Sequence, residues 1–368
     1  GMMAVAKAPM SSARAKTALE NRAVLRLPKD VDRGDVQKML RKLAKRHPML
    51  GAQIRSGGVE DGLEFGVTPL AVAGDGTAPL DVQAGEMMRA SVAKVRLVLQ
   101  VHSAIADAAS MDLLVSEMKA LLDGKDLQKP APGKAVKALP GVLAYDPETV
   151  QGRSDRAFFY YTLADGAAQV PFARRTRALL PLSLGQDHGP AATLSGPCAK
   201  QTEARHMQAF AQALREVTQS TGNVLMARAA RIGETLPKGP CIGPFTLQQP
   251  LLVSADPDDP TAARKLDRAL THAAKHHSFD CFAAAEEFAS WFDKWQVTPL
   301  QIGFEMCAAS QLKQAVSGVS HDVLLQVAKT KYRLIYDADV VAQAQADALA
   351  KAYEAALQSS DKKEVSEA

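Results

Sequence analysis

The 368-residue chain has few cysteines, few aromatic residues and no long apolar run. Its four cysteines stand far apart and form no C-x-x-C pair, so we expect reduced, mostly buried thiols in a cytoplasmic protein. No apolar stretch reaches the roughly 18 residues that a membrane-spanning helix needs. Aromatic residues make up 5% of the chain, which disfavours a surface that stacks bases or sugars.

The chain also lacks a strong excess of charge of one sign. Its formal net charge is +4, and the lysines and arginines are scattered, so neither nucleic acid nor a membrane is an expected partner. Hydrophobic residues at 47% and charged residues at 23% are typical of a soluble globular protein. The length favours two lobes of ordinary size or one large α/β unit.

Periodicity predicts strands and helices along the whole chain. The clearest strand is KVRLVLQV, residues 94–101, with apolar residues at every second position, and a helix over about 110–122 follows it. Further strands are predicted at 24–27, 51–55, 62–68, 86–92, 223–229, 251–253 and 299–306, with a hairpin at 322–336. Further helices are predicted at 33–46 after an Asp32 cap, and at 201–218, 261–277, 282–293 and 339–357, before a charged tail expected to be disordered. Residues 157–163, AFFYYTL, fit a strand or a short helix.

The segment after the clearest strand holds the most suggestive motif. It reads HSAIADA, residues 102–108, between a strand and a helix. Such a loop can direct side chains into a crevice. The segment resembles the H-H-x-x-x-D-G motif of nonribosomal peptide synthetase condensation domains and of chloramphenicol acetyltransferase-like acyltransferases.

Other segments extend this resemblance in the same order along the chain. Residues 45–55, KRHPMLGAQIR, resemble the family's R-H-x-x-L-R segment, and residues 81–90, DVQAGEMMRA, its D-L-x-x-G-P-L-L-R-A segment. The aromatic residues from 159, the G-P-F of residues 243–245 and the YRLIY of residues 332–336 also have counterparts. The order of these pieces carries more weight than any one of them.

The resemblance implies a fold, a partner and a substrate. We expect an α/β (α+β) protein of two chloramphenicol acetyltransferase-like lobes, 1–170 and 171–368, with mixed, largely antiparallel sheets around a central cleft. The loop over about 233–250 would cross between the lobes and help to close a tunnel. An acyl or peptidyl carrier protein is the implied partner, and the implied substrate is linked to phosphopantetheine or coenzyme A. No bound cofactor and no metal are expected.

The sequence departs from the family at the position that matters most. In the family the second histidine of the motif acts as general base or orients the attacking group, because an imidazole titrates near working pH. Ser103 stands at that position, and His102 takes the place of the first, usually structural, histidine. His102 is therefore either a packed strand-end residue or a displaced general base. Ser103 is either a loop-capping hydroxyl or a nucleophile that needs a base beside it.

Two further groups complete the candidate site. In the family the motif aspartate forms a buried ion pair with an arginine, so Asp107 is expected to pair with Arg89 or Arg55. The basic residues Arg174, Arg175 and Arg177 lie near the expected lobe boundary and either attract an acidic carrier or form a solvated loop.

A second histidine pair, in the segment 276–280 (HHSFD), does not fit the motif, because its aspartate is one residue too close. A metal site there would need a third ligand that the sequence does not offer.

Two function classes remain for the protein as a whole. One is an acyltransferase of the condensation type with impaired or altered transfer, and the other is a non-catalytic module that binds a carrier or a partner enzyme.

Overall fold

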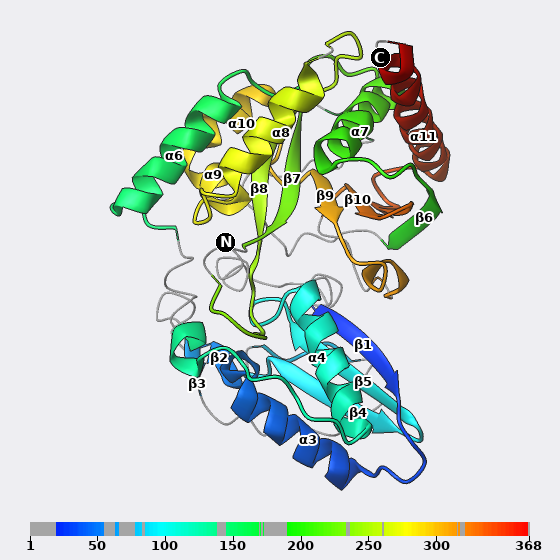
Figure 1. Ribbon diagram of the computed structural model, residues 1–368. Coiled ribbons are helices and arrows are strands. Elements are labelled where there is room, and N and C mark those ends of the chain that lie inside the picture. Colours follow the sequence, from blue (N-terminus) through cyan, green and yellow to red (C-terminus); the bar gives the residue numbers. More distant parts are fainter. Residues whose placement is uncertain are drawn as a thin grey trace.

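The structure, a computed structural model, describes residues 20–54, 63–65, 78–82, 85–137, 145–168, 170, 172, 190–232, 236–259, 261–314, 316 and 321–366, with side chains except at 53–54, 63–65 and 359–366. These residues form two lobes, which lie one above the other in Figure 1. Arg55, Arg174, Arg175 and Arg177 fall outside the described residues, so their predicted roles stay predictions.

Three antiparallel strands in the order β1–β5–β4 form the sheet of the first lobe. They are β1 (Glu20–Arg26), β4 (Met88–Ala93) and β5 (Arg96–His102). The helices α3 (Arg33–Arg46) and α4 (Ala108–Leu122) pack beside each other and on this sheet (Figure 1). A short turn, η1 (Pro48–Gly51), leads into the small pair β2 (Ala52–Ile54) and β3 (Leu63–Phe65).

The alternating pattern of β5 explains how this lobe is assembled. Leu97, Leu99 and Val101 are completely buried in the core beneath the helices, as the period of two predicts. The strand ends at His102, so the residues of the motif turn away from the sheet and then enter α4. The helix predicted over 33–46 is α3, and Asp32 caps it as expected.

Six strands in the order β6–β11–β10–β9–β7–β8 form the sheet of the second lobe. They are β6 (Ala191–Pro197), β7 (Asn223–Arg231), β8 (Thr246–Ser254), β9 (Ile302–Met306), β10 (Val323–Ala328) and β11 (Lys331–Asp337). The central strand β9 runs parallel to both of its neighbours, and the other pairs are antiparallel. The prediction of two lobes with mixed, largely antiparallel sheets is confirmed.

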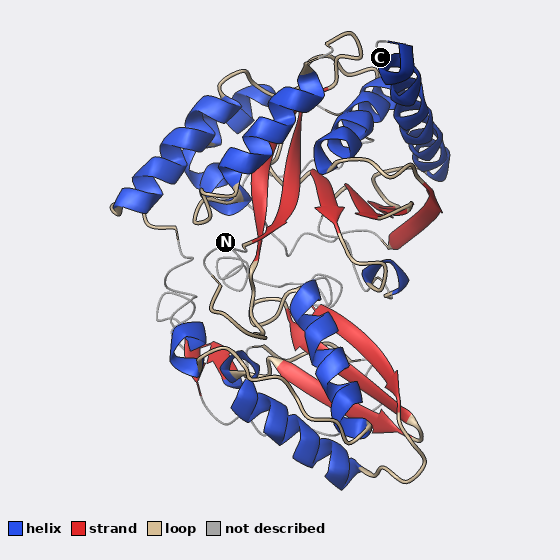
Figure 2. Cartoon of the chain, in the orientation of Figure 1, coloured by secondary structure: helices blue, strands red, loops and turns tan. Residues whose placement is uncertain are grey.

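The helices of the second lobe flank its sheet, and α7, α8 and α11 lie on the side away from the first lobe (Figure 2). They are α6 (Val150–Leu163), α7 (Glu203–Thr218), α8 (Ala262–Ala273), α9 (Cys281–Glu287), α10 (Ala289–Trp295) and α11 (Gln343–Ser366), with the short turn η3 (Gln311–Lys313). The last helix continues to Ser366, so the tail predicted to be disordered is largely helical.

The aromatic segment at 157–163 is the second half of helix α6. Its buried residues Phe159 and Leu163 belong to the core of the second lobe, where α6 packs on β8 and Phe159 stacks on Phe279. A boundary near residue 170 assigns α6 to the first lobe, whereas its packing assigns it to the second. The reason is that a helix joins the core which its apolar face contacts, and the local pattern does not say which core that is.

One segment of the second lobe lies in the core of the first. Between β7 and the start of β8, Ile232, Cys241, Ile242 and Phe245 are buried among the first-lobe side chains, and Leu247 follows them. The predicted crossing over about 233–250 is therefore present among the described residues, although its last part is strand β8 rather than loop. The two lobes share this core and are not held together by a linker alone.

Candidate functional site

The motif lies where β5 passes into α4, at the interface between the lobes. Asp107 is the N-cap of α4, and its carboxylate accepts a hydrogen bond of 2.7 Å from the Ser110 amide. An aspartate at this position accepts a hydrogen bond from a backbone amide that has no partner within the helix, and its negative charge interacts favourably with the positive end of the helix dipole. Its side chain is buried, so its charge needs partners.

The other partners of Asp107 come from the second lobe. Its backbone amide donates to the Gly243 carbonyl at 3.0 Å, and the Thr246 hydroxyl donates to its carboxylate at 2.9 Å. The Arg231 Nε lies 3.8 Å from the same carboxylate oxygen. The motif aspartate therefore fastens the first lobe to the crossing segment.

The predicted pairing of Asp107 with Arg89 is wrong. The Arg89 guanidinium donates to Glu86, at 2.7 Å from its Nε, and to the carbonyl oxygens of residues 78 and 79. Arg89 lies opposite Gln100, two residues before β5 ends at His102, and its guanidinium is already bound, whereas Asp107 comes five residues after that end. Arg231 pairs with Asp107 instead, and since it is distant in sequence, the local pattern gave no sign of it.

His102 is a buried, uncharged residue in this structure. The ring is 1% exposed, its Nδ1 accepts a 3.2 Å hydrogen bond from the Ala104 amide, and its Nε2 has no partner among the described residues. Burial lowers its pKa to about 4. An acceptor at Nδ1 puts the proton of the neutral ring on Nε2. The ring packs at the end of the strand, which is the geometry of a structural histidine.

Ser103 has a different environment, although it is the next residue. Its side chain is partly exposed, and its hydroxyl makes no hydrogen bond with a residue that the structure describes. A serine nucleophile needs a base within hydrogen-bond reach. None of the described side chains supplies such a base to Ser103.

A polar group that sequence reasoning missed lies on the second-lobe side of the interface. Glu305 on β9 accepts a 2.6 Å hydrogen bond from Gln326 on β10, and Gln326 accepts from Arg333 on β11 at 2.6 and 3.0 Å. Burial raises the pKa of Glu305, and the charge of Asp107 raises it further. The sequence holds one signal for this group, a single charged residue inside the predicted strand 299–306.

The loop after β9 makes a second contact between the lobes. The Ser310 hydroxyl donates to the Asp112 carboxylate on α4 at 3.1 Å, and the Gln314 amide donates to its other oxygen at 3.4 Å. Burial raises the pKa of Asp112.

The thiol of Cys307, in the same loop, is not a nucleophile. Burial raises its pKa to about 12, and the charge of Glu305 adds to the shift, so this cysteine is a neutral thiol and not a thiolate.

The second histidine pair has a structural role. His276 Nδ1 lies 2.9 Å from the carboxylate of the fully buried Asp155, which also accepts from the Ser278 amide and hydroxyl at 2.9 and 2.6 Å. Asp280 caps α9. These bonds fix the turn between α8 and α9 against α6. The described residues hold no group of three histidine, cysteine or acidic side chains that could bind a metal ion.

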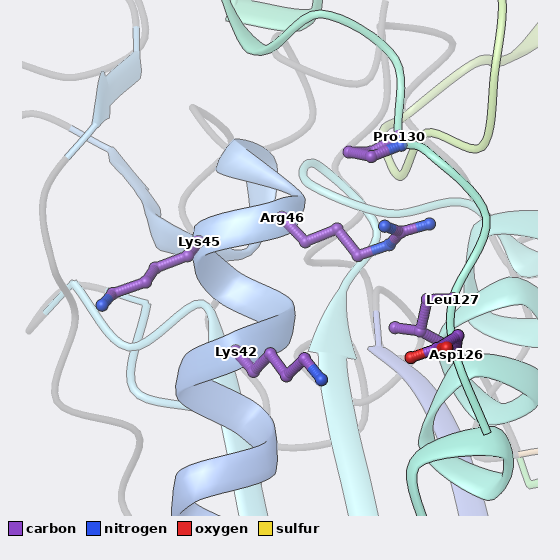
Figure 3. Close-up of a pocket in the computed structure, with 6 residues that line it drawn as sticks. All are labelled: Lys42, Lys45, Arg46, Asp126, Leu127 and Pro130. Carbon is purple, nitrogen blue, oxygen red and sulfur yellow. The ribbon is translucent and has the colours of Figure 1, made fainter. Parts of the chain in front are cut away.

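A recess of about 400 Å³ on the first lobe lies apart from the motif (Figure 3). Lys42 and Arg46 of α3 extend toward its other wall, the segment 126–130, while Lys45 points away. The Arg46 Nε already donates to both oxygens of Glu117 at 3.0 Å. The recess lies beyond the C-terminal end of α4, whereas the motif is at its N-terminal end, so the two are separate.

The four cysteines are free thiols, and Cys241 and Cys281 are buried. No helix among the described residues has the length and apolar character to span a membrane.

Comparison with known proteins identifies the fold. No protein-family model matches the sequence, and no curated protein sequence matches it either. Among solved structures, a variant of the starter condensation domain of the rhizomide synthetase RzmA has a TM-score of 0.72 at 11% identity, over 97% of this chain and 93% of that one. Another variant, in complex with C8-CoA and Leu-SNAC, has a TM-score of 0.68 at 12% identity, over 96% and 90%.

The complex of the X-domain and OxyB from teicoplanin biosynthesis contains a further similar chain. Its TM-score is 0.70 at 17% identity, over 95% of this chain and 92% of that one. This chain therefore has the condensation-domain fold over nearly its whole length. At these identities the likeness concerns the fold and leaves the chemistry to be argued from the site.

Proposed function

We propose that this protein is a condensation-domain-like member of a nonribosomal peptide or related acyl-thioester pathway, with impaired or altered acyl transfer. The observation that carries the proposal is the junction of β5 and α4. In a chain with the condensation-domain fold, this junction keeps the motif aspartate, Asp107, but has Ser103 at the position of the usual catalytic histidine. If the protein is active, it joins an acyl thioester to an amine or an alcohol.

The environment of the motif supports the impairment. His102 has its ring in the core with its pKa lowered to about 4, and Ser103 has no base beside it among the described residues. Transfer that relies on positioning alone can still proceed, because correct placement of two reactants removes several kcal/mol from a barrier. We therefore expect slow transfer and not its complete loss.

An acyl or peptidyl carrier protein is the proposed partner, and the proposed donor is a thioester of phosphopantetheine or coenzyme A. A cytoplasmic location is part of this proposal, and the four free thiols support it.

The test is to mix the protein with an acyl-loaded carrier and amine acceptors, and to compare the wild type with Ser103→His. We expect the substitution to raise the rate at least about 100-fold, because general base catalysis contributes about 100- to 10,000-fold. Product is measured by mass spectrometry. His102→Ala is the control, since loss of a buried structural ring should lower the stability of the protein more than its chemistry. Equal, zero product from the wild type and from Ser103→His would argue against acyl transfer.

A non-catalytic module that binds a carrier or a partner enzyme is the second candidate. The burial of His102 favours it, as does the likeness to a domain seen in complex with another protein, OxyB. Binding of the carrier without product from either variant would favour this candidate.

A further inference from the structure

A row of polar side chains crosses the second-lobe sheet on the face turned toward the first lobe. Glu305, Gln326 and Arg333 stand beside one another in the register of β9, β10 and β11. Their neighbours Phe304 and Leu334 point to the opposite face, into the core of the lobe. Figure 1 shows β9 in orange, with the loop that follows it reaching toward α4, where Ser310 and Gln314 contact Asp112.

The hydrogen bonds in this row fix the orientation of each group. The Arg333 guanidinium can only donate, so Gln326 turns its oxygen to Arg333 and its NH₂ group to Glu305. Gln326 is the one hydrogen-bond donor that the described residues give to Glu305, and it bonds Oε2. The Oε1 oxygen is left available on a side chain that is partly exposed.

The charges at the interface favour a cation at this oxygen. Three carboxylates, Asp107, Asp112 and Glu305, and two guanidiniums, Arg231 and Arg333, lie near enough to act electrostatically on one another or on Cys307 between them. Arg333 is also bound to the carbonyl oxygens of residues 311 and 314. Acidic groups therefore exceed basic groups in this linked set, although the whole chain has a net charge of +4. A half-buried carboxylate is stabilised when an opposite charge approaches it.

We propose that the open carboxylate oxygen of Glu305 is the subsite that receives the acceptor amine as a primary ammonium group, which releases its extra proton to water before the nitrogen attacks the thioester carbonyl and the thiol leaves. The proposal rests on the proposed function, because it identifies the acceptor of that reaction. A guanidinium ligand would use both carboxylate oxygens, and Gln326 already occupies one of them, whereas an ammonium is a point charge that needs only one.

The experiment compares the binding of two thioesters by the wild type and by Glu305→Gln. The first is Leu-SNAC, which carries the ammonium, and the second is 4-methylpentanoyl-SNAC, which has the same side chain without it. Dissociation constants are measured by isothermal titration calorimetry. We expect Glu305→Gln to weaken Leu-SNAC at least about tenfold, the loss of one charge-assisted hydrogen bond, and to leave the second thioester unchanged.

Two variants guard against trivial explanations. Glu148→Gln removes one negative charge from an exposed position of the same lobe and should leave both dissociation constants unchanged. Glu305→Asp keeps the charge but shortens the side chain, so it should weaken Leu-SNAC alone, and by less than Glu305→Gln. Melting temperatures establish that each variant folds.

The subsite is overturned if Glu305→Gln binds Leu-SNAC as the wild type does, if it loses both thioesters equally, or if the wild type binds no Leu-SNAC. Acyl transfer measured on the same samples separates this result from the proposed function. If acyl transfer is observed but Glu305→Gln binds Leu-SNAC as the wild type does, only the proposed subsite is ruled out. If Leu-SNAC binding depends on Glu305 but no product forms, only the proposed acyl transfer is ruled out.

Discussion

At the scale of single residues, two neighbours in the motif have opposite environments because a strand ends between them. His102 is the last residue of β5 and its ring is buried, whereas Ser103 belongs to the turn and is partly exposed. A histidine one position later would occupy the exposed place. The chemistry of the site therefore depends on which residue type occupies a single position after the strand.

The buried histidine makes stability depend on pH. Burial holds the pKa of His102 at about 4 in the folded protein, below its ordinary value of 6.5. Between these two values the unfolded chain binds a proton at this ring that the folded chain does not, so stability falls as the pH falls. We expect His102→Gln to reduce this loss by up to about 1.4 kcal/mol per pH unit between pH 6.5 and 4.

Urea unfolding at several pH values measures this slope. His206 is the matched control, because burial also lowers its pKa to about 4, while its Nδ1 bonds the Tyr353 hydroxyl in the second lobe at 2.7 Å. His206→Gln should reduce the slope by a similar amount. An unchanged slope in His102→Gln would mean that His102 is protonated in the folded state.

At the scale of elements, the N-terminus of α4 serves the helix and the lobe interface at once. Asp107 caps the helix, accepts from Thr246 and lies near Arg231. A cap alone contributes about 1 kcal/mol, and removing a buried partner of other polar groups costs more.

We expect Asp107→Ala to lower the free energy of unfolding by about 2–4 kcal/mol and to increase amide exchange in residues 241–247. Thr202→Ala is the control, because Thr202 caps α7 by bonding the Arg205 amide at 3.2 Å within its own lobe. That substitution should cost about 1 kcal/mol and leave exchange in 241–247 unchanged. If both substitutions lower the free energy of unfolding equally, Asp107 acts only as a helix cap and does not stabilise the lobe interface.

Some elements could be predicted from the sequence and others could not. Strong periodicity found β5 and α3, because the alternating apolar residues of β5 enter the core beneath the helices and the apolar residues of α3 share one buried face. It did not predict that the other face of β5, with Gln100, is buried as well. It left residues 157–163 undecided and gave no sign that α6 belongs to the second core. The Arg231 partner and the Glu305 row were missed for the same reason. Each depends on which distant segments lie side by side, and local spacing does not contain that information.

At the scale of the whole molecule, the crossing segment makes the two lobes depend on each other. Phe245 is 1% exposed in the core of the first lobe, although it directly precedes a strand of the second. A Cβ on Gly243 would lie 2.2 Å from the Phe245 ring, so the glycine permits this close packing. We therefore expect the wild type to unfold as one cooperative unit.

Phe245→Ala should lower stability by about 3–5 kcal/mol and separate the unfolding of the two lobes. Both tryptophans lie in α10 of the second lobe, so their fluorescence follows that lobe, while far-ultraviolet circular dichroism follows the whole chain. The two transitions should coincide in the wild type and part in the variant. Phe292→Ala removes a buried ring from the second core and should shift both transitions together. Coincident transitions in Phe245→Ala would mean that other contacts couple the lobes.

The crossing segment also has a consequence for recombining this protein with relatives of the same fold. A chimaera joined between residues 137 and 145 would pair a first lobe from one parent with Ile242 and Phe245 from the other. Those side chains would enter a foreign core, where a mismatch in volume costs stability. A workable exchange takes residues 232–247 together with the first lobe, which requires three junctions in the chain. The natural unit of exchange is therefore discontinuous in sequence.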